Sequence, residues 1–500
     1  MTLHTNNTQG TRPHVVVIGG GFAGQAIASE LRKTDVDITL IDKNNYLTFQ
    51  PLLYQVATAG LEPEEIVYPI RAVFQNQQNF RFRLGKVVGV DWHQKRVHLQ
   101  GQMPISFDFL VFAAGSAPDY FNIAGAQRNC YPLKQLSDAI TLRSHILKQF
   151  ERVDQNPALL KQGLLNFVVI GGGPTGVEMA GALVELFQNT LKNDYPELPL
   201  EKARVIMIEA GPTLLRPFNE ASQRHAEEVL EDRGVHLVKN ERVTEVARGA
   251  VLLSSNRSIR TATPIWAVGV KASPLAGMLQ LEQTRGGRIV VNRNLSVPGK
   301  PHVFVVGDMA GSQDDEGNLH PQLASVARQG AKHAAGEIKA MLKGKERSAF
   351  VYNNPGIMAT VGRHAAVAEF PGEIRLEGFF AWLTWLFLHL VLLTGFHNRA
   401  HVLVSWLCTY CTKDRSARLI LEEDTSQSED THLAPSSTTN VSADRGPAKH
   451  GMMNQAPQLA RQHKVQPVHT TGDHQAALLK INGILANAEK GRVAGNRRAV

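Results

Sequence analysis

Two glycine-rich segments of the same pattern could each hold a phosphate group. The pattern G-x-G-x-x-G occurs first at Gly19, Gly21 and Gly24 and again at Gly171, Gly173 and Gly176. In such a turn the first glycine permits a tight bend and the second lets a pyrophosphate approach the backbone. The third allows close packing between helix and strand, and the helix N-terminus adds unpaired N–H groups.

A dinucleotide-binding unit needs a strand before its glycine turn and an acidic residue at the end of the next strand, and both copies have them. Apolar, mostly β-branched runs at 15–18 and 167–170 precede the glycines and predict buried parallel strands. Asp42 ends the segment DITLID, and Glu209 ends ARVIMIE after an insertion in the second copy. An acid at this place accepts hydrogen bonds from the adenosine ribose hydroxyls. The sequence therefore predicts an α/β chain with two Rossmann-like domains that bind two dinucleotides at once.

The other reactive side chains indicate little chemistry of their own. Cys130, Cys408 and Cys411 are too few for a disulfide framework, and none follows the first acid, where a dithiol relay would have to stand. Cys130 is expected to be a packed thiol. Cys408 and Cys411 have redox-like spacing, but a membrane-facing or buried structural role is favoured in their apolar segment. No nucleophile pattern is legible, and the 19 histidines show no metal-ligand spacing.

The charge of the chain favours anionic partners. Its 500 residues carry a formal net charge of +8, which suits phosphates or lipid headgroups. There is no basic stripe and no basic run interleaved with aromatic residues, so nucleic acid is not expected as a partner.

The elements after the turns indicate which dinucleotide each turn holds. PHVFVVGDMAG predicts a strand ending at Gly307 and Asp308, and FLVFAAGSAP predicts a strand that turns at Ala114 and Gly115. This return to the first sheet resembles the flavin-disulfide-reductase superfamily, in which that aspartate reaches the flavin ribityl or phosphate group. Ala114 stands where those chains usually have threonine. The resemblance implies FAD, bound tightly but non-covalently, in the outer parts of the chain and NADH as co-substrate in the inserted middle part.

The cysteine-free stretch after the first acid carries a more specific resemblance. NNYLTFQPLLYQVATAGLEPEEIVYPIR, GGGPTGVEMAGAL, WAVGVKASPL, VFVVGDMA and WLFLHLVLLTGFHNR together resemble the type II NADH:quinone oxidoreductases over residues 14–421. The resemblance implies a single-subunit enzyme that transfers a hydride from NADH to FAD and then two electrons to membrane quinone, without proton pumping. The cofactor contacts that it implies are Gly19, Gly21, Phe22, Ala23, Gly24, Asp42, Lys43, Pro51, Leu52, Ala114, Gly115, Gly171, Gly173, Pro174, Thr175, Gly176, Glu178, Glu209, Gly269, Gly307, Asp308, Ser325 and Gln329.

Two residues have catalytic roles by this resemblance, Glu178 and Gln329. Glu178 corresponds to an acid near the nicotinamide–flavin contact and could relay a proton to the quinone. A carboxylate in a first helical turn is equally explained by the helix dipole. The family often has A-Q-x-A-x-Q beneath the flavin, and here Ser325 replaces the first glutamine while Gln329 keeps the second. Gln322 could substitute from another point of this helix, whose N-terminus would favour negative charge on the reduced flavin. The quinone species is left open.

An uncharged apolar run at 379–396 predicts contact with a membrane. As one helix its eighteen residues would span about 27 Å, just short of the ~30 Å hydrocarbon core. Positive charges on both flanks favour a platform lying on the bilayer surface over a single span. A second short piece, HVLVSWLCTYC, would complete it. Trp382, Trp385, Trp406 and Tyr410 suit the headgroup boundary, and a buried core helix is the alternative. The expected location is the cytoplasmic face of the cell inner membrane.

These predictions divide the chain into five parts. They are a disordered N-terminus at 1–12, an FAD-binding domain at 13–118 and 290–345, an NADH-binding domain at 119–289, a membrane-associating region at 346–421 and a disordered tail at 422–500. Two other readings stay open, a soluble ferredoxin or rubredoxin reductase and a non-catalytic redox sensor. A sulfide:quinone reductase would need cysteines near the flavin that are missing here. A homodimer is also left open.

Overall fold

The computed structural model describes residues 12–284, 286–412, 415 and 417–421. Of the predicted disordered segments, 1–12 lies outside these residues except for Arg12, and 422–500 lies outside them entirely.

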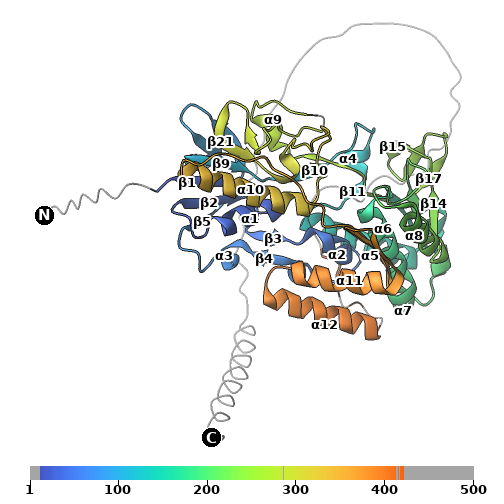
Figure 1. Ribbon diagram of the computed structural model, residues 1–500. Helices are drawn as coiled ribbons and strands as arrows, with labels where there is room; N and C mark the ends of the chain where they lie inside the picture. The colour runs from blue at the N-terminus through green and yellow to red at the C-terminus, as the bar shows by residue number, and fades with distance from the viewer. Residues whose placement is uncertain (1–11, 285, 413–414, 416, 422–500) are drawn as a thin grey trace, which may run out of the picture. The chain divides into compact units, whose positions relative to one another are not determined.

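A six-stranded sheet carries the first glycine turn (Figure 1). β1 runs parallel to β2 on one side and to β9 on the other, and β5 and β21 continue the parallel arrangement outward. β20 closes one edge as an antiparallel strand. Because β21 pairs with β9, the chain returns to its first sheet after a long excursion. The strands are β1 (His14–Ile18), β2 (Asp37–Asp42), β5 (Phe80–Leu84), β9 (Phe109–Phe112), β20 (Ser296–Val297) and β21 (Lys300–Val305).

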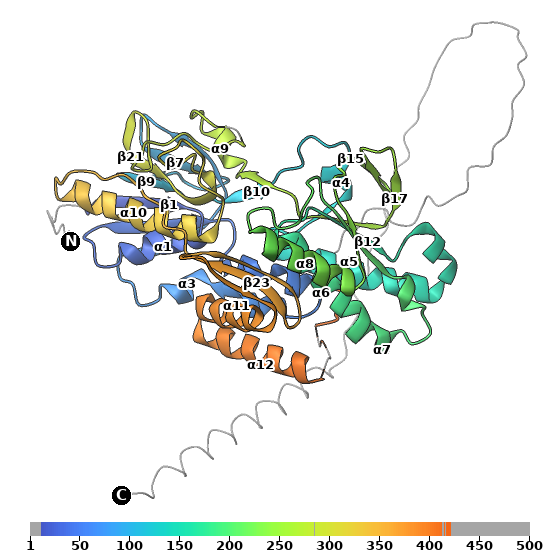
Figure 2. The same cartoon turned by 45° about the vertical axis from the view of Figure 1, so that its right-hand side comes forward.

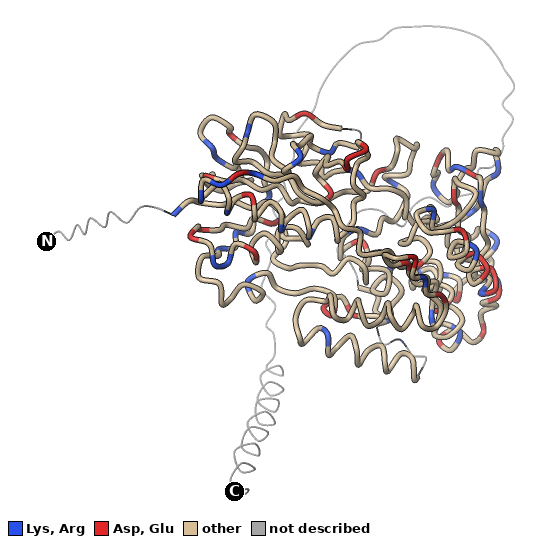
Figure 3. Tube along the Cα trace, viewed as in Figure 1, with Lys and Arg blue, Asp and Glu red and all other residues tan. Residues whose placement is uncertain are grey.

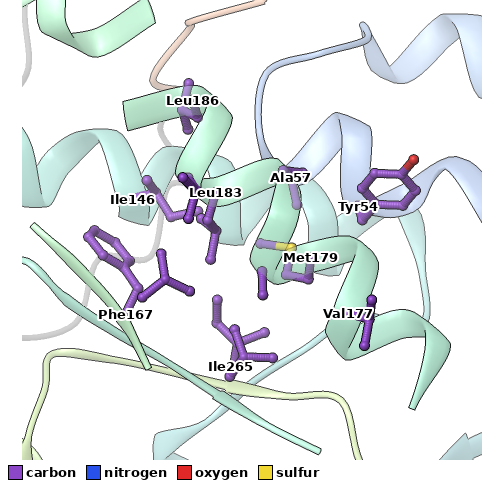
Figure 4. Packing of buried hydrophobic residues seen from close by; sticks show 14 of the residues in the cluster. Tyr54, Ala57, Ile146, Phe167, Val177, Met179, Leu183, Leu186 and Ile265 are labelled. Atoms are coloured by element: carbon purple, nitrogen blue, oxygen red, sulfur yellow. The ribbon is translucent and has the colours of Figure 1, made fainter. Parts of the chain in front are cut away.

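A second, five-stranded parallel sheet carries the second glycine turn. Its order is β11-β18-β12-β13-β14, so β12 lies at the centre as β1 does in the first sheet. The strands are β11 (Tyr131–Pro132), β12 (Asn166–Ile170), β13 (Arg204–Ile208), β14 (Val235–Val238) and β18 (Thr263–Trp266). Figure 4 shows Phe167 and Ile265 of this sheet packed beneath Met179 and Leu183 of helix α6 (Pro174–Glu185) and Ile146 of α5 (Leu136–Gln155). This apolar contact sets which face of α6 lies on the sheet and which side chains point away from it.

Smaller elements complete the described part of the chain. Helix α10 (Ala324–Leu342) lies beside α1 (Phe22–Glu30) in both views of the ribbon (Figures 1 and 2). The remaining helices of the first 300 residues are α2 (Leu53–Ala57), α3 (Ile70–Val73), α4 (Ala126–Asn129), α7 (Lys192–Asp194), α8 (Glu220–Asp232) and α9 (Leu275–Met278). The remaining strands before residue 300 are β3 (Tyr46–Thr48), β4 (Val67–Pro69), β6 (Val87–Asp91), β7 (Arg96–Leu99), β8 (Ile105–Ser106), β10 (Ser116–Pro118), β15 (Val243–Ala247), β16 (Ala250–Leu253), β17 (Ser258–Arg260) and β19 (Val270–Ala272).

The apolar run at 379–396 is not helical over its whole length, because its helix ends at Leu392 and a turn separates it from a second helix that begins at Phe396. After the antiparallel sheet β22 (Ile357–Gly362), β23 (Ala365–Phe370) and β24 (Ile374–Glu377), helix α11 covers Gly378–Leu392 and α12 covers Phe396–Thr412. Between them Gly395 has φ +88°, and a Cβ there would lie 2.5 Å from the ring of Tyr68. The turn between the two helices therefore needs glycine at position 395, because any side chain there would collide with Tyr68. Hydropathy alone does not reveal this turn. No described helix combines the length and the apolar character that crossing a membrane needs.

Candidate active site

The first glycine turn has the shape that a dinucleotide needs. Gly19 has φ +105°, and a Cβ there would lie 2.4 Å from the carbonyl oxygen of Ala113 on the neighbouring strand. A Cβ on Gly24 would lie 1.8 Å from the carbonyl oxygen of Gly19, so only glycine lets helix and strand approach so closely. A Cβ on Gly21 would meet nothing within 4 Å. Open space therefore faces the second glycine, where a pyrophosphate would lie.

The second turn repeats this geometry position by position. Gly171 has φ +109° and its Cβ would meet Ala267 O at 2.8 Å, while a Cβ on Gly176 would meet Gly171 O at 1.9 Å. Gly173 again faces open space. Pro174 occupies the first position of α6, where its missing N–H is not needed, and Thr175 beside it is exposed. Two equivalent turns on two sheets indicate two binding sites for dinucleotides.

The two acids anchor the turns. Gly20 N donates to Asp42 Oδ2 at 2.6 Å, and Gly172 N donates to Glu209 Oε2 at 2.7 Å. The second oxygen of each carboxylate accepts from a backbone amide two residues further on, at 2.8 and 2.7 Å. Burial raises the pKa of Asp42, and the amides lower it. Each acid thus lies at its glycine turn, within reach of a ribose bound there.

Asp308 lies where the returning strand meets the end of β9. Its Oδ2 accepts from Ser116 Oγ at 2.5 Å and lies 3.7 Å from Lys134 Nζ. Gln322 donates through Nε2 to the carbonyl oxygen of Asp308 at 3.0 Å, which ties the start of α10 to the same loop. The sequence analysis missed Ser116 and Lys134, because a serine that begins β10 (Ser116–Pro118) and a lysine just before α5 form no recognisable pattern.

The remaining predicted cofactor contacts surround these groups. Lys43 donates to Gln135 Oε1 at 2.5 Å, and Phe22 packs edge-on against Phe49 with ring centroids 6.1 Å apart. Gly307 has φ +66°, and its Cβ would lie 3.1 Å from Ala327 on α10. Gly115 and Gly269 also have positive φ. Ala23 and Leu52 are buried, Ala114 is half-buried, and Pro51 lies with Leu52 in the short 3₁₀ turn Gln50–Leu52.

The two residues of the expected quinone helix bind a neighbouring segment. Ser325 Oγ lies 2.9 Å from Tyr352 OH, and Gln329 exchanges two hydrogen bonds with the backbone of Asn353, at 2.7 and 3.0 Å. Neither lines the cavity that holds Glu178. The structure therefore does not bring Gln329 and Glu178 together in one described cavity.

Glu178 lies on α6, facing a cavity of about 60 Å³. This is room for a few water molecules but not for a quinone ring. Thr360 N donates to Glu178 Oε1 at 3.5 Å. Burial raises the pKa of Glu178 to about 8, against the lowering effect of Thr360 and of the Trp385 indole. At neutral pH this carboxyl group is therefore mostly protonated and can donate a proton, which a free glutamate cannot do.

The thiols lie away from these groups. Cys130 is buried, and burial raises the pKa of its thiol to about 12, so it is unreactive. Cys408 and Cys411 are free and exposed on α12. Their predicted membrane-facing role remains a prediction.

Helices α11 and α12 expose an apolar surface, which we call the platform. Figure 3 shows them almost free of charged residues, and within their bounds Arg399 is the single Lys, Arg, Asp or Glu. The exposed large apolar side chains of the platform are Phe379, Phe380, Leu383, Phe387, Val391, Leu392, Phe396, Leu403, Val404 and Leu407. Several are more than half exposed, Phe380 at 71% and Phe387 at 67%.

The platform tryptophans contradict one expectation. Trp382, Trp385 and Trp406 were expected at the headgroup boundary, but they are only 7%, 1% and 5% exposed. They pack inward against the protein, with Trp385 stacked on His389 and Trp382 edge-on to the half-buried Tyr410. Phenylalanine and leucine therefore make up the outer face.

Comparisons with known proteins agree with this arrangement. Residues 13–331 match the family model of the pyridine nucleotide-disulphide oxidoreductases. Two type II NADH:quinone oxidoreductases of Mycobacterium tuberculosis are each 38% identical to the chain, over 82% and 85% of it and over 91% and 93% of their own lengths. A type II NADH:quinone oxidoreductase of Haemophilus influenzae is 27% identical over 75% of the chain and 92% of its own length.

Solved structures share the fold. NDH2 from Plasmodium falciparum in complex with NADH superposes with a TM-score of 0.74 at 20% identity, covering 82% of this chain and 100% of that one. The sulfide:quinone oxidoreductase of Aquifex aeolicus reaches 0.62 at 21% identity, over 78% of this chain and 92% of the other. At these identities the likeness concerns the fold alone.

Proposed function

Because the chain belongs to the type II NADH:quinone oxidoreductases, within the pyridine nucleotide-disulphide oxidoreductase family, we propose how its residues carry out NADH-driven quinone reduction. The observation that carries the proposal is the pair of equivalent glycine turns, each with open space at its second glycine, in a chain that also exposes an apolar platform.

The first turn fits FAD. Gly21 leaves room for the pyrophosphate, Asp42 can accept from the adenosine ribose, and Asp308 with Ser116 offers hydrogen bonds to the ribityl chain or phosphate. When bound, FAD supplies the redox chemistry, accepting a hydride from NADH and passing two electrons to quinone. The start of α10, held to Asp308 by Gln322, points its positive dipole end toward this region and favours negative charge there.

The second turn fits NADH. Gly173 leaves room for the pyrophosphate at the start of α6, and Glu209 can accept from both hydroxyls of the adenosine ribose. A carboxylate at this position repels a 2′-phosphate, so NADH is preferred over NADPH. The proposal includes the division of the chain into an FAD-binding domain at 13–118 and 290–345 and an NADH-binding domain at 119–289.

Glu178 supplies a proton for the quinone. Reduction by NADH takes up one proton from the medium in each turnover, in addition to the hydride. The protonated carboxyl of Glu178 can deliver this proton, and the water-sized cavity beside it allows its replacement. Gln329 and Ser325 bind the quinone head group in this proposal. That role requires their contacts with Asn353 and Tyr352 to be exchanged for contacts with quinone.

The platform places the enzyme on a bilayer. Burying exposed Phe and Leu side chains in lipid contributes about 1.5–3 kcal/mol for each well-buried side chain, so a few suffice for firm attachment. We place this attachment on the cytoplasmic face of the cell membrane, without a span. A homodimer is compatible with it.

One assay separates this proposal from its competitors. The purified chain should contain one non-covalent FAD, be bleached by NADH in stopped flow, and be reoxidised by quinones. Reoxidation by ferredoxin in place of quinone would favour a soluble reductase, and reduction of the FAD by sulfide in place of NADH would favour a sulfide:quinone oxidoreductase. Bleaching without turnover on any acceptor would favour a redox sensor.

A further inference from the structure

A line of hydrogen bonds connects the platform to Glu178. The indole N–H of Trp406, on α12, donates to Gln55 Oε1 at 2.8 Å, and Gln55 Nε2 donates to Tyr54 OH at 3.0 Å. Tyr54 OH lies 3.3 Å from Thr360 Oγ1, and Thr360 N donates to Glu178 Oε1 at 3.5 Å. The five residues come from α12, α2, β22 and α6, four elements that are far apart in the sequence.

The first donor fixes the direction of the line. An indole N–H can only donate, so Gln55 must turn its carbonyl oxygen to Trp406 and its amide group to Tyr54. The phenol oxygen of Tyr54 then accepts. Its own proton needs an acceptor because the group is buried, and Thr360 Oγ1 is the acceptor at hand. Tyr54 thus contacts the side chain of Thr360, while the backbone N–H of the same residue donates to Glu178.

Three side chains of the line are buried, while Gln55 is half-buried and lines the same water-sized cavity as Glu178. Trp406 is 5% exposed, Tyr54 7% and Thr360 4%. Hydrogen bonds in such an environment are stronger and more directional than at a surface, and a partner that is left unsatisfied is costly. The hydrogen bonds of Trp406, Tyr54 and Thr360 therefore favour one orientation of Tyr54 against Thr360.

We infer that Trp406 and Gln55 are positioning residues for the proton donor: they orient Tyr54 against the side chain of Thr360 and so hold in place the strand segment whose Thr360 N–H donates to Glu178. The inference rests on the proposed role of Glu178. It links the helix that faces the bilayer to the proton chemistry of the site without any contact between Trp406 and substrate.

Loss of the line has a predictable effect on Glu178. Donors directed at a carboxylate stabilise its charged form, so loosening Thr360 should raise the pKa of Glu178 further. The other titratable groups of the cavity are Tyr54, Glu185, Arg363, Tyr410 and Arg415, and His389 of α11 stacks on Trp385 at its edge. A Trp406→Phe substitution changes none of these groups, so a shift of the pH profile reports the line itself.

The test is the pH profile of NADH:quinone turnover in the FAD-loaded full chain. Trp406→Phe and Tyr54→Phe should each move the alkaline limb upward, by about half a pH unit or more, and lower kcat more than they change KM for quinone. The double variant should shift no further than the larger single shift, because both substitutions break one line. Trp92→Phe is the matched control, since its indole donates to the carbonyl oxygen of Leu279 far from this cavity.

Three outcomes separate the possibilities. A limb that stays at its wild-type position in both Trp406→Phe and Tyr54→Phe overturns the inference, as does an equal shift in Trp92→Phe. Glu178→Gln should remove the limb. If Glu178→Gln keeps the wild-type limb, the proposed role of Glu178 fails, and that result is distinct from a failure of the line alone. Tyr54→Phe leaves α12 intact, so the test survives if Trp406→Phe does not fold.

Discussion

Replacing Gly173 by alanine should weaken NADH binding without weakening the fold. Gly173 has φ −75° and ψ 179°, an extended conformation that alanine adopts freely. A Cβ there would meet nothing within 4 Å, so the substitution strains no contact. Removing a glycine also restricts the unfolded chain, which stabilises the folded one by about 0.4–1 kcal/mol. We therefore expect an unchanged or slightly higher melting temperature.

The same methyl group would stand where the pyrophosphate must approach the backbone. Forcing a methyl group into a close contact costs about 1–3 kcal/mol, which corresponds to a roughly 5- to 150-fold increase in the Kd for NADH. Calorimetric titration of the FAD-loaded protein with NAD⁺, together with thermal melting, measures both quantities. FAD content should stay at the wild-type level, because the first turn is untouched.

Two matched variants make the test decisive. Gly336→Ala, at an exposed position of α10 with open space around it, should also raise the melting temperature slightly, because it removes a glycine from a helix, and should leave NAD⁺ binding unchanged. Gly176→Ala places a Cβ 1.9 Å from Gly171 O and should disrupt the fold itself. If Gly173→Ala binds NAD⁺ as tightly as the wild type, the assignment of the second turn to NADH is wrong. If it melts as Gly176→Ala does, the reasoning from open space is wrong.

Three further predictions concern the acid, the platform and the buried carboxyl. Glu209→Gln should narrow the preference for NADH over NADPH in kcat/KM, because it removes the charge that repels a 2′-phosphate; an unchanged ratio would place the discrimination elsewhere. The double variant Phe380→Asp and Phe387→Asp should bind lipid vesicles more than a hundredfold more weakly in a sedimentation assay, since two exposed phenylalanines contribute about 3–6 kcal/mol. The control Met103→Asp, at an exposed position outside the platform, should bind vesicles as the wild type does. Burial raises the pKa of Glu178 from 4.5 to about 8, so the folded chain holds its proton more tightly than the unfolded chain, and its contribution to stability falls as pH rises from about 4.5 to about 8. The Glu178→Gln variant cannot ionise, so its free energy of unfolding should fall less over this pH range, by up to about 1.4 kcal/mol per pH unit. Denaturant titrations at several pH values measure this difference. Parallel curves for variant and wild type would contradict the raised pKa of Glu178.

The sequence was sufficient where a local pattern has one physical solution. Three glycines at fixed spacing after an apolar strand, with an acid at the end of the next strand, leave the chain few alternatives. The structure has this geometry at both Gly19–Gly24 and Gly171–Gly176. The return of the chain to its first sheet before Asp308 was predicted from the resemblance of this strand–Gly–Asp segment to the flavin-disulfide-reductase superfamily, and the pairing of β21 with β9 confirms it.

The sequence was insufficient where residues from distant elements meet. Lys134 and Ser116 at Asp308, and Trp406 and Gln55 in the line to Glu178, belong to no repeat or spacing that a single chain displays. The platform shows a different limit. Hydropathy identifies 379–396 as apolar, but the break before α12 depends on the ring of Tyr68, and the direction of each tryptophan depends on what the protein offers it to pack against.

Helix α6 joins these parts of the enzyme. Gly173 at its N-terminus belongs to the NADH turn, and Glu178 lies about one and a half turns further along, beside the cavity. Glu185 at its C-terminus pairs with Arg233 and Arg415, each at 3.1 Å, and Arg415 also donates to Thr58 O at 2.7 Å. Arg415 follows α12, so this buried pair ties the end of the platform to the helix that begins at the nicotinamide site. Removing one partner of such a pair costs about 3–5 kcal/mol, because the other charge is left uncompensated. One continuous helix therefore connects the turn proposed for NADH to the ion pairs at the end of the platform, and it carries the proposed proton donor Glu178 between them.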